Sequence, residues 1–135
     1  MTGADHKIVL VVDDEVFARL FAVQVFLDEG FTVLEAADAE EGLEVLENND
    51  DVGLLFTDIS MPGEMDGLDL IARVKNERPG LSFVATSGQV VPDDEALPRG
   101  ARFLPKPYTA HALMTAIREV AAVRATGGIR AAAAC

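Results

Sequence analysis

The chain is poor in cysteine and in positive charge, and both shortages argue against whole classes of protein. Its one cysteine, Cys135, cannot form an intrachain disulfide and gives no sign of an oxidising compartment. Against 23 acidic residues stand 11 basic ones, a formal net charge of -12. Phosphate backbones are bound by an excess of lysine and arginine, so we expect no nucleic-acid partner.

Long hydrophobic runs are also missing. No stretch reaches the ~18 apolar residues of a membrane span. The polar, acidic start of the chain predicts no signal peptide. We therefore expect a cytoplasmic protein that does not contact a membrane. Half of the residues are hydrophobic, which is enough for a substantial core, and 135 residues fit one domain.

What the chain does contain is an alternation of short apolar runs and longer amphipathic segments. Five runs are predicted strands: Lys7–Val12, Thr32–Ala36, Val52–Thr57, Ser82–Thr86 and Ala101–Leu104. Four segments between or after them are predicted helices: Val16–Glu29, Ala39–Asn48, Gly67–Glu77 and Thr109–Ala125. This order predicts an α/β fold, a five-stranded parallel sheet that is doubly wound as a (βα)5 unit.

The fourth of these units is abnormal. Only eleven residues separate Gly88 from Gly100, and Pro92 and Pro98 are among them. Because proline fits only the first turn of a helix, a full helix does not fit in this space. We expect a shortened fourth helix of one or two turns.

Polar residues follow several of the predicted strands. They are Asp13 and Asp14 after the first, Asp58 after the third, Thr86 and Ser87 at the end of the fourth, and Lys106 after the fifth. Carboxyl ends of parallel strands meet at one edge, where such sheets bind ligands. Adjacent carboxylates repel unless a hard cation with oxygen ligands lies between them, and a solvated turn is the alternative for the first pair. The whole set suits a carboxylate nucleophile that attacks phosphorus.

These motifs, in this order, resemble the receiver domain of a bacterial two-component response regulator, of the stand-alone kind typified by the chemotaxis response regulator. The motifs are Asp13-Asp14, Asp58-Ile59-Ser60-Met61-Pro62, Met65-Asp66-Gly67, Ser87-Gly88 and Lys106-Pro107-Tyr108. The resemblance covers residues 6–125 and implies a flavodoxin-like fold, a flexible tail at 126–135 and no output domain. One departure is Glu64, which makes the loop after Asp58 a residue longer than usual.

The resemblance implies a role for each matching position. Asp58 is then the phosphoacceptor, and the cofactor is Mg²⁺. The implied metal ligands are Asp14 directly, Asp13 through water or by ordering it, Asp58, and the main-chain carbonyl of Ser60. Mg²⁺ keeps several waters, which suits so sparse a set of protein ligands.

The residues that contact the phosphoryl group and report on it are also implied. Lys106 is the phosphoryl-contacting lysine, and a cis Lys106-Pro107 bond is expected. Ser87 matches the switch hydroxyl, with Thr86 as the alternative. Phe103 falls at the position of the switch aromatic; the alternative is an ordinary apolar residue of an edge strand.

Partners follow from the resemblance and from one helix. A sensor histidine kinase or a histidine phosphotransfer protein is the expected phosphoryl donor, and a protein target is expected downstream. The first predicted helix carries more apolar residues than one buried stripe needs, so we expect Phe17 and Phe21, with Pro107 and Tyr108, to form a docking face; incidental surface apolar residues are the alternative. The shortened fourth helix predicts a monomer or weak dimer.

The predicted function is that of a phosphoacceptor which switches conformation and signals by protein contact or phosphoryl shuttling. It is not an enzyme beyond assisting its own phosphoryl transfer and autodephosphorylation. The alternative is a receiver-like module that binds proteins without phosphorylation, which the complete residue set disfavours. A dehalogenase-type phosphatase needs a second aspartate where Ser60 stands, and a flavodoxin-type carrier needs a phosphate loop where Asp13-Asp14-Glu15 would repel phosphate.

Overall fold

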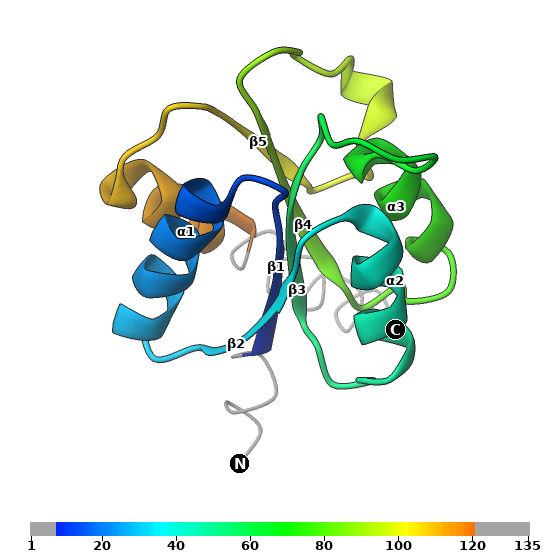
Figure 1. Ribbon diagram of the computed structural model, residues 1–135, viewed down its shortest axis with the longest axis horizontal. Helices are drawn as coiled ribbons and strands as arrows, with labels where there is room; N and C mark the ends of the chain where they lie inside the picture. The colour runs from blue at the N-terminus through cyan, green and yellow to red at the C-terminus, as the bar shows by residue number, and fades with distance from the viewer. Residues whose placement is uncertain (1–7, 121–135) are drawn as a thin grey trace, which may run out of the picture.

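A five-stranded parallel sheet forms the centre of the protein, which the computed structural model describes from residue 8 to residue 120. The strands are β1 (Ile8–Val12), β2 (Thr32–Ala36), β3 (Leu54–Asp58), β4 (Ser82–Ser87) and β5 (Arg102–Pro105). Their spatial order is β2-β1-β3-β4-β5 (Figure 1). The chain therefore winds outward in both directions from β1, and the predicted fold is confirmed. The predicted Lys7 and residues 121–135 lie outside the described residues.

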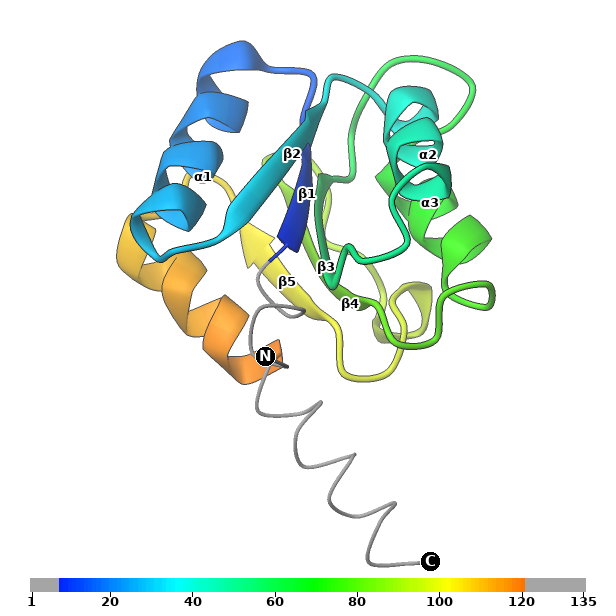
Figure 2. The ribbon, with the colours of Figure 1, turned by 90° about the horizontal axis from the view of Figure 1, so that it is seen from below.

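Helices cover both faces of this sheet. On one face lie α1 (Val16–Asp28) and a helix over residues 110–120; on the other lie α2 (Ala39–Glu47) and α3 (Gly67–Val74) (Figure 2). Successive side chains of β1 point to opposite faces of the sheet. Val9 and Val11 belong to the hydrophobic cluster under α1, whereas Leu10 and Val12 belong to the cluster under α2 and α3. A strand that is buried on both faces must be apolar throughout, which explains the continuous run in the sequence.

Helices α1 and α2 each end one residue earlier than the sequence predicts, and two boundaries differ by more. β3 begins at Leu54 rather than Val52, and α3 ends at Val74 rather than Glu77. Arg78, which follows α3, donates to the carbonyl oxygens of Val52, Leu46, Asn49 and Asp50 at 2.8 to 3.3 Å. The carbonyl of Val52 therefore accepts from a distant guanidinium, and strand pairing starts after it.

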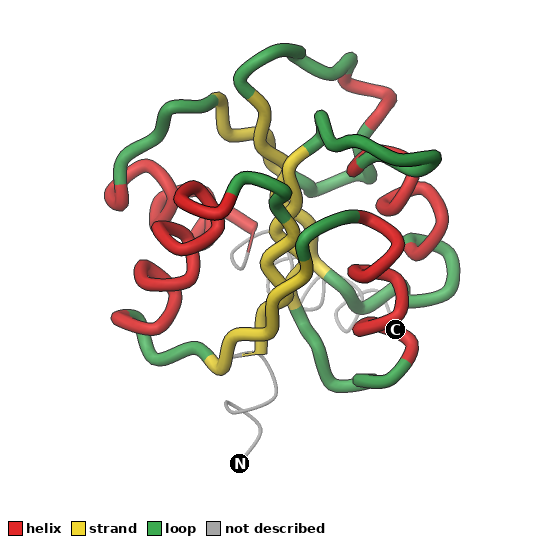
Figure 3. The backbone as a smooth tube through the Cα atoms, viewed as in Figure 1, coloured by secondary structure: helices red, strands yellow, loops and turns green. Residues whose placement is uncertain are grey.

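The connection between β4 and β5 has almost no regular structure. Its one element is a 3-10 turn at Asp94–Ala96, so the expected shortening of the fourth helix is confirmed (Figure 3). Val90 and Val91 in this connection are exposed to solvent. No helix within residues 8–120 has both the length and the hydrophobicity needed to cross a membrane.

Candidate functional site

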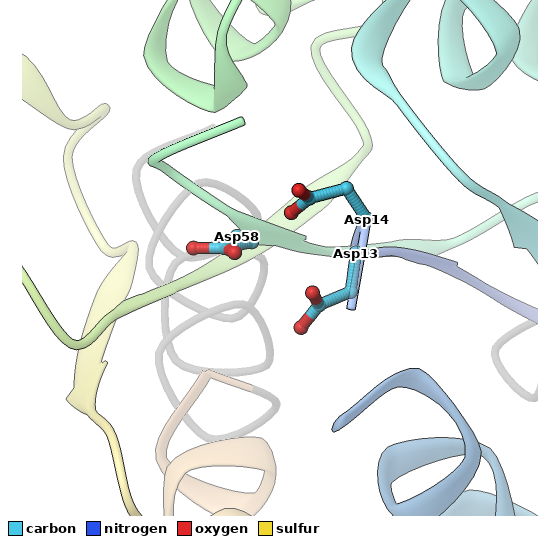
Figure 4. A group of neighbouring side chains, drawn as sticks. All are labelled: Asp13, Asp14 and Asp58. Carbon is cyan, nitrogen blue, oxygen red and sulfur yellow. The ribbon is translucent and has the colours of Figure 1, made fainter. Parts of the chain in front are cut away.

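Three carboxylates meet where β1 and β3 end side by side. Asp13 and Asp14 follow β1, and Asp58 is the last residue of β3 (Figure 4). One oxygen from each lies within 4.8 Å of the other two. Asp13 and Asp58 are buried and Asp14 is exposed. The buried Oδ2 of Asp13 forms an ion pair with Lys106 but accepts no hydrogen bond within the described residues. A hard divalent cation fits this set, because it would satisfy acceptor-only oxygens and relieve their mutual repulsion.

Lys106 supplies the positive charge of the site. Its ammonium nitrogen lies 2.9 Å from Glu15 Oε1, 3.0 Å from Asp13 Oδ2 and 3.2 Å from Asp58 Oδ2. Desolvation alone would lower the pKa of Lys106, but the hydrogen bonds and charges of the surrounding carboxylates outweigh it and raise this pKa. The lysine is therefore held charged. The expected cis bond between Lys106 and Pro107 is present.

Asp58 has a different balance of forces. Burial raises the pKa of its carboxyl group, the positive charge of Lys106 opposes that rise, and the negative charge of Asp13 adds to it. Its Oδ1 accepts a hydrogen bond of 3.2 Å from the backbone N–H of Ser60. An additional cation beside the carboxylate would favour its ionised, nucleophilic form.

The loop between β3 and α3 fixes the backbone of Asp58. A Cβ at Gly67 would overlap the carbonyl oxygen of Asp58, so only glycine allows this approach. The N–H of Gly67 donates to Ile59 O at 3.0 Å. Asp66 and Asp69 close a capping box at the start of α3. The backbone of Asp58 is thus packed against the capped start of α3.

The two candidate switch hydroxyls differ in their surroundings. Ser87 Oγ lies 3.3 Å from Ser60 Oγ and accepts from the N–H groups of Gln89 and Val90, both at 3.1 Å. Thr86 is fully buried, and its hydroxyl has no partner within the described residues. Ser87 thus joins the loop after Asp58 to the β4–β5 connection. Phe103 is half-buried and packs against the cluster under α2 and α3.

The predicted docking residues adjoin the carboxylates. A groove of about 700 Å³ runs from Asp58 and Lys106 to Phe17, Phe21, Pro107 and Tyr108. Among the apolar side chains of α1, Phe17 is 86% exposed and Phe21 43% exposed, as the surplus of apolar residues predicts. Tyr108 packs against the rings of Phe21 and Phe56, at centroid distances of 5.8 and 5.9 Å. One groove therefore joins the acidic cluster to an exposed aromatic face.

Two functional side chains are not singled out by the sequence. Glu15 reaches Lys106, 91 residues away. Arg19 donates to the Asp13 carbonyl at 2.7 Å and to Glu35 Oε1 at 3.1 Å, which holds the end of β1 in place. The sequence offers only weak signals for them: Glu15 directly follows the aspartate pair, and Arg19 lies in the first turn of α1.

Known proteins share this arrangement. Residues 9–118 match the family model of the response regulator receiver domain. The chemotaxis protein CheY of Listeria monocytogenes is 34% identical over 120 residues, covering 83% of this chain and 96% of CheY. The sensor kinase CckA of Brucella abortus is 37% identical over 119 residues, covering 83% of this chain but only 12% of the kinase.

A solved structure shows the same fold. One chain of the CheX-CheY-BeF3-Mg²⁺ complex from Borrelia burgdorferi superposes with a TM-score of 0.74 at 28% identity. The match covers 84% of this chain and 87% of that one. The likeness therefore extends over nearly the whole described sheet and its helices.

Proposed function

The chain belongs to the family of response regulator receiver domains, signalling modules that act as phosphoacceptors in two-component systems, and on this premise we propose that Asp58 is the phosphoacceptor. One observation carries the proposal. Asp58 touches Lys106 at 3.2 Å and belongs to the acidic cluster. Asp13 also has these contacts, but it does not line the groove through which a phosphoryl donor would approach. Asp58 lines that groove.

In the proposed reaction an oxygen of Asp58 attacks the phosphorus of a phosphohistidine. The O–P bond forms, the P–N bond breaks and the imidazole leaves with the electron pair. Lys106 offsets negative charge on the transferred oxygens, and the hydroxyl of Ser87 donates to one of them. Thr86 is the less suited hydroxyl because it has no hydrogen-bond partner within the described residues, whereas Ser87 Oγ already lies 3.3 Å from Ser60 Oγ in the loop after Asp58. The domain assists its own phosphorylation and the later hydrolysis in this way.

Magnesium fits the acidic cluster as the cofactor. Asp14 would bind it directly, Asp13 through water, and Asp58 and the main-chain carbonyl of Ser60 would complete the protein ligands. When bound, Mg²⁺ supplies positive charge that offsets the carboxylates and the phosphoryl oxygens. The closeness of the three carboxylates supports this assignment. So does the buried Oδ2 of Asp13, which forms an ion pair with Lys106 but accepts no hydrogen bond within the described residues.

The aromatic face of α1 is proposed to receive the phosphoryl donor, a histidine kinase or a histidine phosphotransfer protein. Phe17 and Phe21 are exposed beside the groove that contains Asp58, and Pro107 and Tyr108 line the same groove. Clustered exposed apolar side chains mark interaction sites. The reaction would take place in the cytoplasm.

A charged variant tests this docking face. Phe17→Glu should slow phosphotransfer from the donor protein at least tenfold while leaving phosphorylation by acetyl phosphate unchanged, since the small donor needs no docking. Leu27→Glu is the matched control, because Leu27 is an exposed residue of α1 that does not line the groove. Equal loss of both reactions in Phe17→Glu would refute the docking role.

The proposed output depends on the segment 88–100. Ser87 Oγ accepts from the N–H groups of Gln89 and Val90, so a move of this hydroxyl toward a phosphoryl oxygen would release the start of that segment. We expect residues 88–100 to rearrange and become ordered on phosphorylation, and the new surface to contact a downstream protein or to accompany phosphoryl shuttling. With the fourth helix reduced to a turn, the protein is expected to be a monomer or weak dimer.

Mass spectrometry tests the phosphoacceptor directly. Incubation with acetyl phosphate and Mg²⁺ should add one phosphate, and Asp58→Asn should add none. Asp14→Asn should lose the dependence on Mg²⁺ together with most of the product. If the unmodified protein gains no phosphate, the alternative of a phosphorylation-independent binding module is favoured instead.

A further inference from the structure

Arg19 holds the backbone between the two aspartates that follow β1. Its Nη1 donates to the carbonyl oxygen of Asp13 at 2.7 Å, and its Nε donates to Glu35 Oε1 at 3.1 Å. Glu35 belongs to β2, the strand beside β1, and its ion pair with Arg19 directs the guanidinium toward the end of β1. A guanidinium is a planar fork of donors, so it can hold a carboxylate and a carbonyl at once in fixed directions.

The carbonyl that accepts from Arg19 belongs to the peptide bond between Asp13 and Asp14. Because a peptide group is planar, the direction of this C=O also sets the direction in which the chain reaches the Cα of Asp14. The N–H of Asp13 is held as well, since it donates to the carbonyl oxygen of Ala36 at 3.2 Å. Asp13 is therefore fixed through its N–H by β2 and through its C=O by α1.

The carboxylate of Asp14 depends on this backbone for its position. It is exposed, and within the described part of the chain it accepts no hydrogen bond and forms no ion pair. Asp13 differs, because its Oδ1 accepts from the backbone N–H of Glu15 at 2.9 Å. Asp14 nevertheless offers an oxygen to the cluster with Asp13 and Asp58 that could hold a metal ion. The place of that oxygen therefore follows from the peptide that Arg19 holds.

We propose that Arg19 is a positioning residue for Mg²⁺, which orients the peptide between Asp13 and Asp14 so that the carboxylate of Asp14 is already placed to bind the ion. This inference rests on the proposed function, in which the acidic cluster binds Mg²⁺. The positive charge of Arg19 acts in the opposite direction, because it repels a cation. If only this charge mattered, its removal would tighten Mg²⁺ binding. If the hold on the peptide matters, the same change weakens binding.

Arg19→Gln removes the contact to the peptide and keeps the contact to β2. The amide nitrogen of glutamine takes the place of Nε, so it can still donate to Glu35, but no atom takes the place of Nη1 to reach the Asp13 carbonyl. Residues that orient a metal ligand from behind typically change metal affinity by roughly 10- to 100-fold, and we expect the Kd for Mg²⁺ to rise about tenfold.

The Kd is measured from the free energy of unfolding in urea at a series of Mg²⁺ concentrations and constant ionic strength. A ligand that binds only the folded state adds stability that depends on its concentration and its Kd. The increase with Mg²⁺ therefore gives the Kd even for a variant that is less stable without metal. A purely structural role of Arg19 would lower the stability without Mg²⁺ and leave the Kd unchanged.

Arg102→Gln is the matched control. Arg102 donates from Nε to Glu119 Oε1 and from Nη1 to the carbonyl oxygen of Ala101, both at 3.2 Å. It stands at the start of β5, at the other end of that strand from Lys106, so the Kd for Mg²⁺ should change by less than about twofold. An unchanged or lower Kd in Arg19→Gln would overturn the proposal, and so would an equal rise in both variants. If Mg²⁺ does not stabilise the unmodified protein, the proposed metal site fails and the inference fails with it.

Discussion

The β3–α3 connection is held by close packing of its backbone, whereas the start of the β4–β5 connection is held by the hydroxyl of Ser87 and Leu97 further along packs against the cluster under α2 and α3. In the first, Gly67 packs against the carbonyl of Asp58 and a capping box starts α3. In the second, Ser87 Oγ accepts from the N–H groups of Gln89 and Val90, and a single 3-10 turn follows. Both connections leave the same edge of the sheet, one beside the proposed nucleophile and the other beside the proposed switch.

This difference separates two tasks of a phosphorylation switch. The nucleophile needs a fixed position, which close backbone packing provides. The reporting segment needs a second conformation of similar free energy, which few buried contacts allow. Val91 in the β4–β5 connection is 80% exposed, so moving it disrupts little of the core. The backbone at Asp58 is therefore closely packed, whereas the segment after Ser87 can change conformation at a smaller cost in free energy.

The largest expected difference between the two connections is in the free energy of unfolding after a glycine in each is replaced by alanine. Gly67→Ala should destabilise the protein by about 3 kcal/mol, because the new Cβ overlaps the Asp58 carbonyl and the backbone must shift. Phosphorylation by acetyl phosphate should fall with it. Urea denaturation and mass spectrometry measure the two effects.

The matched control is Gly88→Ala in the other connection. Its new Cβ would lie 3.5 Å from Lys106 Cβ, an ordinary contact, and Gly88 has no left-handed backbone. The free energy of unfolding should change by less than about 0.5 kcal/mol. Equal destabilisation by the two substitutions would remove the proposed difference between the connections.

Stabilisation of the protein by Mg²⁺ should depend on the acidic cluster and not on the β4–β5 connection. A ligand that binds only the folded state at ten times its Kd stabilises by about 1.4 kcal/mol. Mg²⁺ should therefore raise Tm in the unmodified protein and in Ser87→Ala alike, but not in Asp14→Asn. An effect of Mg²⁺ that disappears in Ser87→Ala would show that the two connections are not separate.

The charge of Asp58 is expected to have a smaller effect on the stability of the folded protein. Because burial raises the pKa of this carboxyl group, folding favours its protonated form. That contribution is fully present below the pKa of the unfolded chain and is lost as the pH rises through the pKa of the folded protein. At pH 7 without metal, Asp58→Asn should therefore be more stable by about 1 kcal/mol.

The pH dependence of this stability difference tests whether the charge of Asp58 destabilises the folded protein. The advantage of Asp58→Asn should shrink as the pH falls toward about 4, where the unfolded aspartate also takes up a proton. Urea denaturation at both pH values measures it. A variant that is less stable than the unmodified protein at pH 7 would mean that the contact between Asp58 and Lys106 outweighs the desolvation of the carboxylate.

The sheet could be predicted from the sequence because its three central strands, β1, β3 and β4, are buried on both faces. The run Ile8–Val12 is apolar at every position, and Thr32–Ala36 was predicted with the bounds that the structure shows. The start of β3 could not be predicted, since Val52 gives its carbonyl to Arg78 through a contact between residues 26 positions apart. Such a contact depends on the fold and leaves no local pattern.

The acidic site could be predicted for a similar reason. Asp13, Asp14, Asp58 and Lys106 each lie at or just after the end of a strand, and the topology alone brings them together. The hold of Glu15 on Lys106 depends on the direction of two long side chains, which a motif does not specify. The close approach of Gly67 to the Asp58 carbonyl could not be predicted from the sequence either, although the Asp66-Gly67 pair belongs to one of the family motifs.

Hydrogen exchange with and without beryllofluoride and Mg²⁺ tests most directly whether phosphorylation at Asp58 reaches the β4–β5 connection. We predict slower exchange of the amides of residues 88–100 when the mimic is bound, with little change in α3 (Gly67–Val74), whose start is already fixed. Asp58→Asn should abolish the effect. Unchanged exchange at residues 88–100 with the mimic bound would contradict the account.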